Sequence, residues 1–340
     1  MDEVLRREAQ GGFEPFAVGD PWGPAWDTTW FRVRGDVPAG DQPGPVVLVV
    51  DLGYGGMTGF GAEGLVYAGD PPVARQGISP NHREVPVDGR FDLLVEAAAN
   101  PAVVTAAAGG GGAAPLLLAD PDGPPMLRLA ACHLAAVDVE VDALWHDWSL
   151  LLELHDVLPD GTGSPRRAKL LRALNAAADA LDPDDVAGTA AAARAVLAPL
   201  LAAPSHASAH TFLAVGNAHI DTAWLWPLRE TRRKCARTFS TAATLLERHP
   251  DHVFAVSQAQ QLAWVRDDHP ALWERLRKLA ADGRFEPVGS TWVEADCNIP
   301  SGESLIRQVV HGKRFFRDEL GVDTDGLWLP DVFGYAAGLP

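Results

Sequence analysis

The sequence is poor in cysteine and has no disulfide pattern. Only three cysteines occur among 340 residues, and no two of them form a CxxC pair. They are Cys132, Cys235 and Cys297. Such a sparse, odd set argues against a disulfide framework and fits a reducing compartment. The N-terminal residues Met1 to Gln10 are charged and contain no apolar stretch of the kind found in secretory signals, so we expect a cytoplasmic protein.

Positive charge and long apolar runs are also scarce. The 28 lysines and arginines face 45 aspartates and glutamates, which gives a formal net charge of -17. A chain with this balance repels nucleic acids and anionic membranes and favours a neutral or cationic ligand. No apolar run in the sequence is long enough to span a bilayer. We therefore expect neither nucleic acid nor a membrane as a partner.

The composition, 47% hydrophobic and 21% charged, is that of a globular protein large enough for two domains and a connector. Residues 1–140 contain short alternating apolar runs between Gly, Pro and Asp clusters, which predict an antiparallel β-sandwich. Residues 141–205 have Ala and Leu at helical spacing and predict a helical connector. In residues 206–340 strands and helices alternate, which predicts a parallel sheet with crossover helices.

Candidate metal ligands follow the first predicted strand of this last part. The apolar run from Thr211 to Val215 predicts a buried strand, and His219 and Asp221 come after it as an H-x-D pair. Alternate residues at a strand end project to the same side, so an imidazole nitrogen and a carboxylate oxygen can converge on one ion. This mixture suits Zn²⁺, and Co²⁺ is accepted by the same ligand types. Alone, the pair is a weak signal, because a histidine hydrogen-bonded at a strand end has the same pattern.

Aromatic and acidic residues accompany the pair. Trp224 and Trp226 follow it closely, and indole rings beside a polar cluster commonly form stacking platforms for sugars. Core packing is the alternative for both, and more so for Trp226. Later in the chain another apolar run, Leu327 to Leu329, predicts a fourth strand that leads into Asp331 and Phe333.

Three motifs in this order resemble those of the α-mannosidases of glycoside hydrolase family 38. They read A-H-I-D-T-A-W-L-W-P at 218–227, W-V-E-A-D-C-N-I-P-S-G-E at 292–303 and W-L-P-D-V-F-G-Y at 328–335. The resemblance is close from about residue 211 onwards, and the N-terminal part looks more loosely like the cytosolic and vacuolar branch. It implies that residues 206–340 are the first part of a seven-stranded α/β barrel, truncated after four strands, with the sandwich as a structural cap or, alternatively, a sugar-binding domain.

The resemblance also implies roles for individual residues. Asp331 matches the family's nucleophile, which also binds the metal, and His219 and Asp221 match two further ligands of its zinc. Trp224 and Phe333 match aromatic side chains that line the mannose pocket. The implied activity is hydrolysis of terminal α-mannosyl residues with retention, in which the metal binds sugar hydroxyls.

Several expectations remain open at this point. One of the acidic residues Glu294, Asp296 and Glu303 could contact a neighbouring sugar or orient a ligand, and we favour Asp296 for this. The alternative is that they are loop and helix-start residues. In the family the acid/base aspartate and a fourth metal ligand, a histidine, follow the third motif, so this chain by itself is expected to be inactive and to bind metal poorly. The alternatives are a metal-dependent amidase or deacetylase, in which the ion activates water, and an inactive sugar-binding fragment. The expected partner is an α-mannoside oligosaccharide, and a homo-oligomer is compatible with the sequence.

Overall fold

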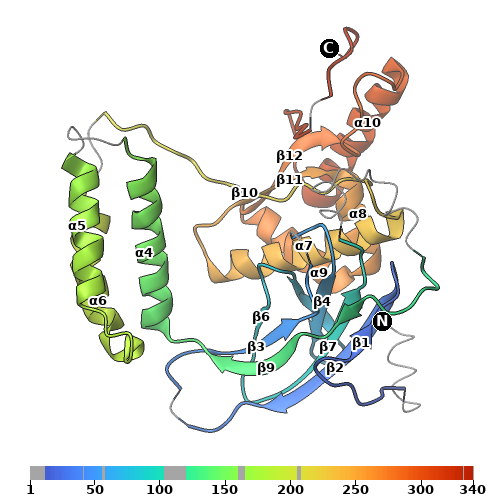
Figure 1. Cartoon of the computed structure of the whole chain (residues 1–340). Coiled ribbons are helices and arrows are strands. Elements are labelled where there is room, and N and C mark those ends of the chain that lie inside the picture. Colours follow the sequence, from blue (N-terminus) through green and yellow to red (C-terminus); the bar gives the residue numbers. More distant parts are fainter. Residues whose placement is uncertain are drawn as a thin grey trace.

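The computed structural model describes residues 12–40, 42–55, 58–102, 120–159, 165–204, 208–331 and 333–339. Residues Met1 to Gln10, on which the expectation about a secretory signal depends, lie outside these ranges. Three parts follow one another along the chain: a β-sandwich, a helical unit and an α/β part (Figure 1). No helix within the described ranges combines the length and the apolar character needed to cross a membrane.

Two antiparallel sheets form the sandwich, as the alternating pattern predicted. The larger sheet has the order β2 (Thr28–Asp36), β7 (Arg90–Ala98), β4 (Glu63–Ala68), β5 (Val73–Ile78). The smaller sheet has the order β6 (Glu84–Pro86), β3 (Val46–Asp51), β9 (Ala131–Ala136). A short pair of strands, β1 (Pro21–Trp22) and β8 (Leu127–Arg128), is formed separately. Inward-facing residues of both sheets, among them Leu48, Val66 and Val95, form one buried core.

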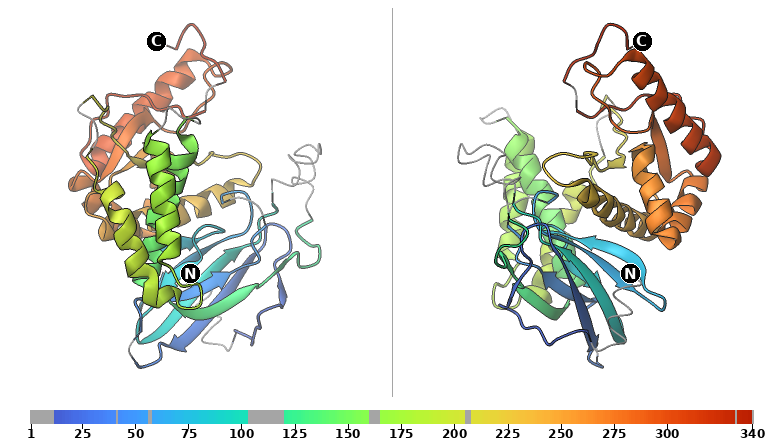
Figure 2. Two further views of the ribbon diagram at one scale, coloured as in Figure 1. Left: turned by 60° about the vertical axis from the view of Figure 1, so that its left-hand side comes forward. Right: turned by 90° about the vertical axis from the view of Figure 1, so that its right-hand side faces the viewer.

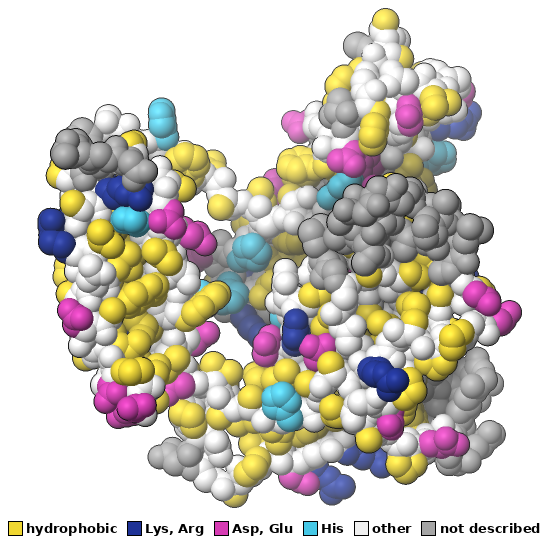
Figure 3. All heavy atoms as spheres, in the orientation of Figure 1, with side chains coloured by type: hydrophobic (Ala, Val, Ile, Leu, Met, Phe, Trp, Pro, Cys, Tyr) yellow, Lys and Arg dark blue, Asp and Glu magenta, His cyan; other side chains and the backbone are white. Residues whose placement is uncertain are grey.

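The predicted helical connector forms a unit with its own core. It consists of α4 (Val139–Val157), α5 (Pro165–Asp179) and α6 (Val186–Leu201). Leucines at helical spacing pack between the three helices, for example Leu151, Leu170 and Leu197. The helices lie side by side at one side of the sandwich (Figures 1 and 2), and a deep hollow separates them from the α/β part (Figure 3).

The α/β part contains a parallel sheet of three strands in the order β10 (Gly216–Asn217), β11 (Phe254–Gln258), β12 (Phe285–Thr291). Helix α7 (Leu228–Arg248) connects the first two strands, and α8 (Ala259–Asp268) and α9 (Pro270–Ala281) connect the second and third. Helix α10 (Gly302–Phe315) continues as a π-helical turn, η1 (Phe316–Leu320), and ends at Gly321 with a φ of 74°. Buried aromatic and leucine side chains from these helices and strands form the core of the α/β part.

The strand predicted over Thr211 to Val215 is wrong. The chain is irregular there, with Phe212 and Leu213 exposed by 90% and 94%. Pairing begins only at Gly216, whose backbone N–H donates to the carbonyl of Val253 at 2.8 Å. Before Val253 the neighbouring chain is still turning out of α7, so it offers no extended partner to residues 211–215.

The fourth predicted strand, Leu327 to Leu329, is not formed either. The residues just before Leu327 lie beside β12, but the carbonyls of Thr324 and Gly326 accept hydrogen bonds from side chains and not from a neighbouring strand. The Ser290 hydroxyl donates to the carbonyl of Gly326 at 2.7 Å, and the Lys313 ammonium donates to that of Thr324. Within the described residues the parallel sheet therefore has three strands, and the barrel implied by the resemblance stays a prediction.

Helix α7 joins the sandwich to the α/β part. The backbone N–H of Gly77 in β5 donates to the Thr241 hydroxyl at 2.8 Å, and the Thr244 hydroxyl donates to the carbonyl of Arg75 at 2.7 Å. A Cβ on Gly77 would lie only 3.1 Å from the Cβ of Arg237, so the strand and the helix approach closely. The sandwich is thereby fixed next to the chain segment that precedes α7, which contains His219 and Asp221.

Candidate metal centre

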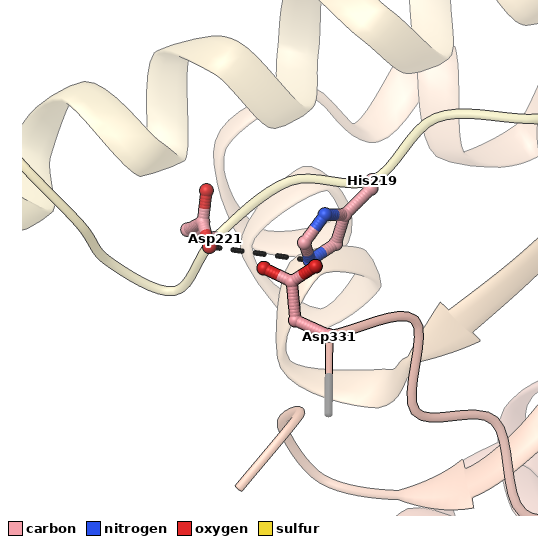
Figure 4. A group of neighbouring side chains, drawn as sticks. All are labelled: His219, Asp221 and Asp331. Carbon is pink, nitrogen blue, oxygen red and sulfur yellow. Dashed lines mark ion pairs between the residues drawn. The ribbon is translucent and has the colours of Figure 1, made fainter. Parts of the chain in front are cut away.

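The three predicted ligands come together in space. One ligand atom from each of His219, Asp221 and Asp331 lies within 4.8 Å of the others. His219 and Asp221 lie on the segment after β10, and Asp331 reaches them from the segment after η1 (Figure 4). The Nε2 atom of His219 is 3.9 Å from Oδ1 of Asp221. One imidazole and two carboxylates form a donor set that fits a divalent ion such as Zn²⁺ or Co²⁺.

Glu294 connects the two segments that supply these side chains. Its Oε2 lies 2.6 Å from Nε2 of His219, and its Oε1 accepts a hydrogen bond from the backbone N–H of Asp331 at 2.8 Å. The Glu294 side chain is only 11% exposed. The sequence interpretation named this residue but preferred its neighbour Asp296. The available signal was the position of Glu294 just after the end of β12, where functional side chains of a parallel sheet gather.

Two buried glutamines hold the backbone between His219 and Asp221. The Nε2 groups of Gln258 and Gln261 both donate to the carbonyl of Ile220, at 3.0 and 2.7 Å. Gln258 also accepts, through Oε1, from the backbone N–H of Glu294 at 3.1 Å. Buried polar groups with partners on two segments fix those segments relative to each other. Sequence reasoning missed both glutamines, although a polar run directly after a buried strand was a usable signal.

The predicted aromatic residues line the same cavity. Its volume is about 550 Å³, and its walls include the three candidate ligands, Trp224 and Phe333. Trp224 is 48% exposed and Phe333 is 80% exposed, so both rings are accessible from the cavity. Trp226, in contrast, is buried, and its indole N–H donates to the Thr231 hydroxyl at 2.9 Å. For Trp226 the structure favours the core alternative.

Asp296 also lines the cavity, but its carboxylate takes part in a turn. Its Oδ1 accepts from the backbone N–H groups of Asn298 at 2.7 Å and Ile299 at 3.0 Å. The bonds from Ile299 and Asn298 lower the pKa of the Asp296 carboxyl, because they stabilise its charged form. The predicted contact of Asp296 with a second sugar stays a prediction.

Comparison with known families agrees with these motifs. Residues 209–340 match the family described as "Glycosyl hydrolases family 38 N-terminal domain", and residues 3–135 match "Alpha-mannosidase, jelly roll domain". Residues 209–340 belong to glycosyl hydrolase family 38. The first match contains all three motifs, and the second covers the β-sandwich, so the family resemblance inferred from the sequence is confirmed.

Individual family members extend the similarity over nearly the whole chain. The chain is 39% identical to "Alpha-mannosidase 2C1" of Mus musculus over 98% of its own length, and 31% identical to "Alpha-mannosidase" of Saccharomyces cerevisiae over 99%. It is 30% identical to "Alpha-mannosidase 2" of Arabidopsis thaliana over 36% of its length. The chain spans 31% of the length of both the mouse and the yeast protein.

Proposed function

We propose that the protein is a metal-dependent α-mannosidase that removes terminal α-mannosyl residues with retention of configuration. The observation that carries this proposal is the convergence of His219, Asp221 and Asp331, from two family motifs, in one cavity with Trp224 and Phe333. The names of the relatives support α-mannosides as the substrate class. The alternative of an amidase or deacetylase receives no such support.

Each ligand residue has a defined task in this proposal. His219, Asp221 and Asp331 would hold the ion, and a Zn²⁺ or Co²⁺ ion bound there supplies a Lewis acid and a template for sugar hydroxyls. The Glu294 carboxylate accepts a hydrogen bond from the backbone N–H of Asp331 and so orients the nucleophile. Trp224 and Phe333 offer apolar ring surface to the sugar and exclude water from that side.

Asp331 acts as nucleophile. One of its carboxylate oxygens forms a bond to the anomeric carbon while the bond from that carbon to the leaving oxygen breaks, and a second carboxyl gives a proton to the leaving oxygen. Water then attacks the anomeric carbon and gives a proton to the second carboxylate, while the bond to Asp331 breaks and the starting configuration is restored. We assign the acid/base role to none of the described residues, because the family resemblance puts that aspartate after the third motif. In the same way, we propose that β10, β11 and β12 belong to a seven-stranded barrel.

The test is Asp331→Asn in the complete gene product. We expect kcat for an aryl α-mannoside to fall by at least about 10³-fold, because the amide is a very poor nucleophile. The matched control is Asp325→Asn, an exposed aspartate on the same segment that does not line the cavity and should leave kcat unchanged. A chelator should abolish the wild-type activity, and Zn²⁺ or Co²⁺ should restore it. Normal turnover by Asp331→Asn, or turnover of N-acetyl sugars in place of mannosides, would refute the assignment.

A further inference from the structure

One wall of the candidate site comes from the sandwich. Phe60 lies between β3 and β4, yet it lines the same cavity as the three candidate ligands. Its ring meets the ring of Trp224 edge-on, with the centroids 5.7 Å apart and the planes at 83°. Phe60 is half-buried, so part of its surface remains accessible. The aromatic surface of the cavity thus extends from Trp224 in the α/β part onto the sandwich.

The position of Phe60 is fixed by buried charges at the boundary with α7. The backbone N–H of the preceding residue, Gly59, donates to Oε1 of Glu63 at 3.1 Å, and its carbonyl accepts from the ammonium of Lys234 at 2.8 Å. Lys234 and Glu63 are themselves paired at 2.9 Å, and both side chains are at most 10% exposed. The Lys234 ammonium also lies 4.8 Å from the centre of the Trp226 ring. Lys234 therefore contacts both the residue before Phe60 and the ring of Trp226.

We propose that Phe60 contacts the carbohydrate and that the sandwich is a part of the substrate site as well as a cap on it. This inference rests on the function proposed above. A neutral pyranoside presents apolar C–H faces, and an uncharged ring that adds to the Trp224 surface is suited to pack against them. If Phe60 served the sandwich core alone, it would face that core as Phe31 does, which packs against the sandwich core cluster.

The contact should affect binding more than the chemical step. Phe60 carries no polar atom, and it touches Trp224, whereas the ligands and the proposed nucleophile are contributed by other segments. An interaction of this kind is expected to be equally strong in the ground state and the transition state, which changes KM and leaves kcat nearly constant.

The experiment uses the complete gene product with three substitutions. Phe60→Ala removes the ring, Phe60→Tyr keeps it, and Phe16→Ala is the control. Phe16 is a 42% exposed phenylalanine of the sandwich that packs on Phe31 and does not line the cavity. Turnover of an aryl α-mannoside, calorimetric titration of methyl α-mannoside and thermal unfolding are measured for each. We expect Phe60→Ala to raise KM, and the dissociation constant of methyl α-mannoside, by about 2- to 10-fold, with kcat within about 2-fold. Phe16→Ala should behave like the wild type, and Phe60→Tyr, which keeps the ring, should raise KM and the dissociation constant less than Phe60→Ala does.

Each other outcome has a definite meaning. If the wild-type protein is active but Phe60→Ala leaves KM and the dissociation constant unchanged, the inference is wrong while the proposed function stands. An equal rise in KM for Phe16→Ala would reveal general loosening of the sandwich and would also overturn it, as would a fall in kcat at constant KM. A wild-type protein that neither cleaves nor binds mannosides would overturn the proposed function and the inference together.

Discussion

Glu294 links the two segments that carry the candidate ligands. Its two carboxylate oxygens contact His219 and the backbone of Asp331, and its own backbone N–H is held by the buried Gln258. Hydrogen bonds with a charged partner are about twice as strong as neutral ones, so this side chain restricts both segments. The Nε2 atom of His219 that contacts Glu294 also faces Asp221, so an ion bound there would replace this contact. The bond from the backbone N–H of Asp331 to Glu294 would remain and orient that ligand, and partners of this kind are expected to influence metal affinity.

The substitution Glu294→Gln should therefore weaken metal binding. The amide keeps the size of the side chain but removes its charge, and we expect the affinity for Zn²⁺ to fall by about 10- to 100-fold. The measurement is a titration of the complete gene product with Zn²⁺ against a chromophoric chelator. Glu303→Gln is the control from the same motif, because Glu303 is 66% exposed and pairs with Arg307 at the surface. Equal affinities in both variants would show that Glu294 does not support the centre.

At the scale of secondary structure elements, the close packing of α10 against β12 supports the strand that leads to the candidate centre. Gly312 makes this approach possible. A Cβ on Gly312 would lie 2.3 Å from the carbonyl oxygen of Ser290 and 2.4 Å from the carbonyl carbon of Thr291. Such distances are far below van der Waals contact, so the helix is held against the strand by the absence of a side chain. The same strand ends shortly before Glu294, which links the helix packing to the candidate centre.

We expect Gly312→Ala to destabilise the protein, although alanine is the better helix former. The added methyl group must push α10 away from β12, which should reduce the free energy of unfolding by about 1 to 3 kcal/mol. Gly302→Ala, in the first turn of the same helix, is the matched control, since its Cβ would have no atom within 4 Å. There the change should be neutral or stabilising by up to about 1 kcal/mol. Urea unfolding compares the two, and equal stability of both variants would contradict the close packing.

On the scale of the whole molecule, a buried network of charges joins the sandwich to the α/β part. Three carboxylates from Glu63, Glu96 and Glu230 face three cations from Arg233, Lys234 and Arg237. Burial by itself would raise the pKa of the Glu230 carboxyl, but the charges of Arg237, Arg233 and Lys234 outweigh burial and lower it. The carboxyl of Glu230 is fully buried and also accepts from the amide of Asn100 at 2.7 Å. The contact between the two parts therefore depends on Glu230 being ionised.

Glu230→Gln should reduce the free energy of unfolding by about 3 to 5 kcal/mol at pH 7, because it removes one of the two carboxylates that pair with the buried Arg237 and leaves the charge of Arg237 only partly compensated by Glu63. A carboxyl whose pKa is lowered on folding stabilises the protein above its ordinary pKa of 4.5 and loses this effect as the pH falls through the lower, folded value. The difference between wild type and variant should thus shrink below pH 4.5. Denaturant unfolding at several pH values measures this difference in the free energy of unfolding. Glu274→Gln, in an exposed pair with Arg277, should cost less than about 1 kcal/mol at every pH.

The sequence by itself determined the features that depend on local patterns. Alternating apolar residues predicted the sandwich, and Ala and Leu at helical spacing predicted the helical connector, because side-chain direction repeats with the local backbone geometry. The three motifs identified His219, Asp221 and Asp331, and the structure brings these residues together. Ligand types are a property of the side chains themselves, so their chemistry is readable without a fold.

Only the tertiary structure decided what depends on partners far apart in the chain. The runs at 211–215 and 327–329 have strand-like composition, but a strand forms only where another strand offers hydrogen bonds in register, and the described neighbours of these runs do not. The bridging position of Glu294 and the approach of Phe60 to Trp224 depend on contacts that span 37 and more residues of sequence. No local pattern encodes such contacts, because they arise from the docking of the sandwich and of the segment before Asp331 onto α7, β11 and β12.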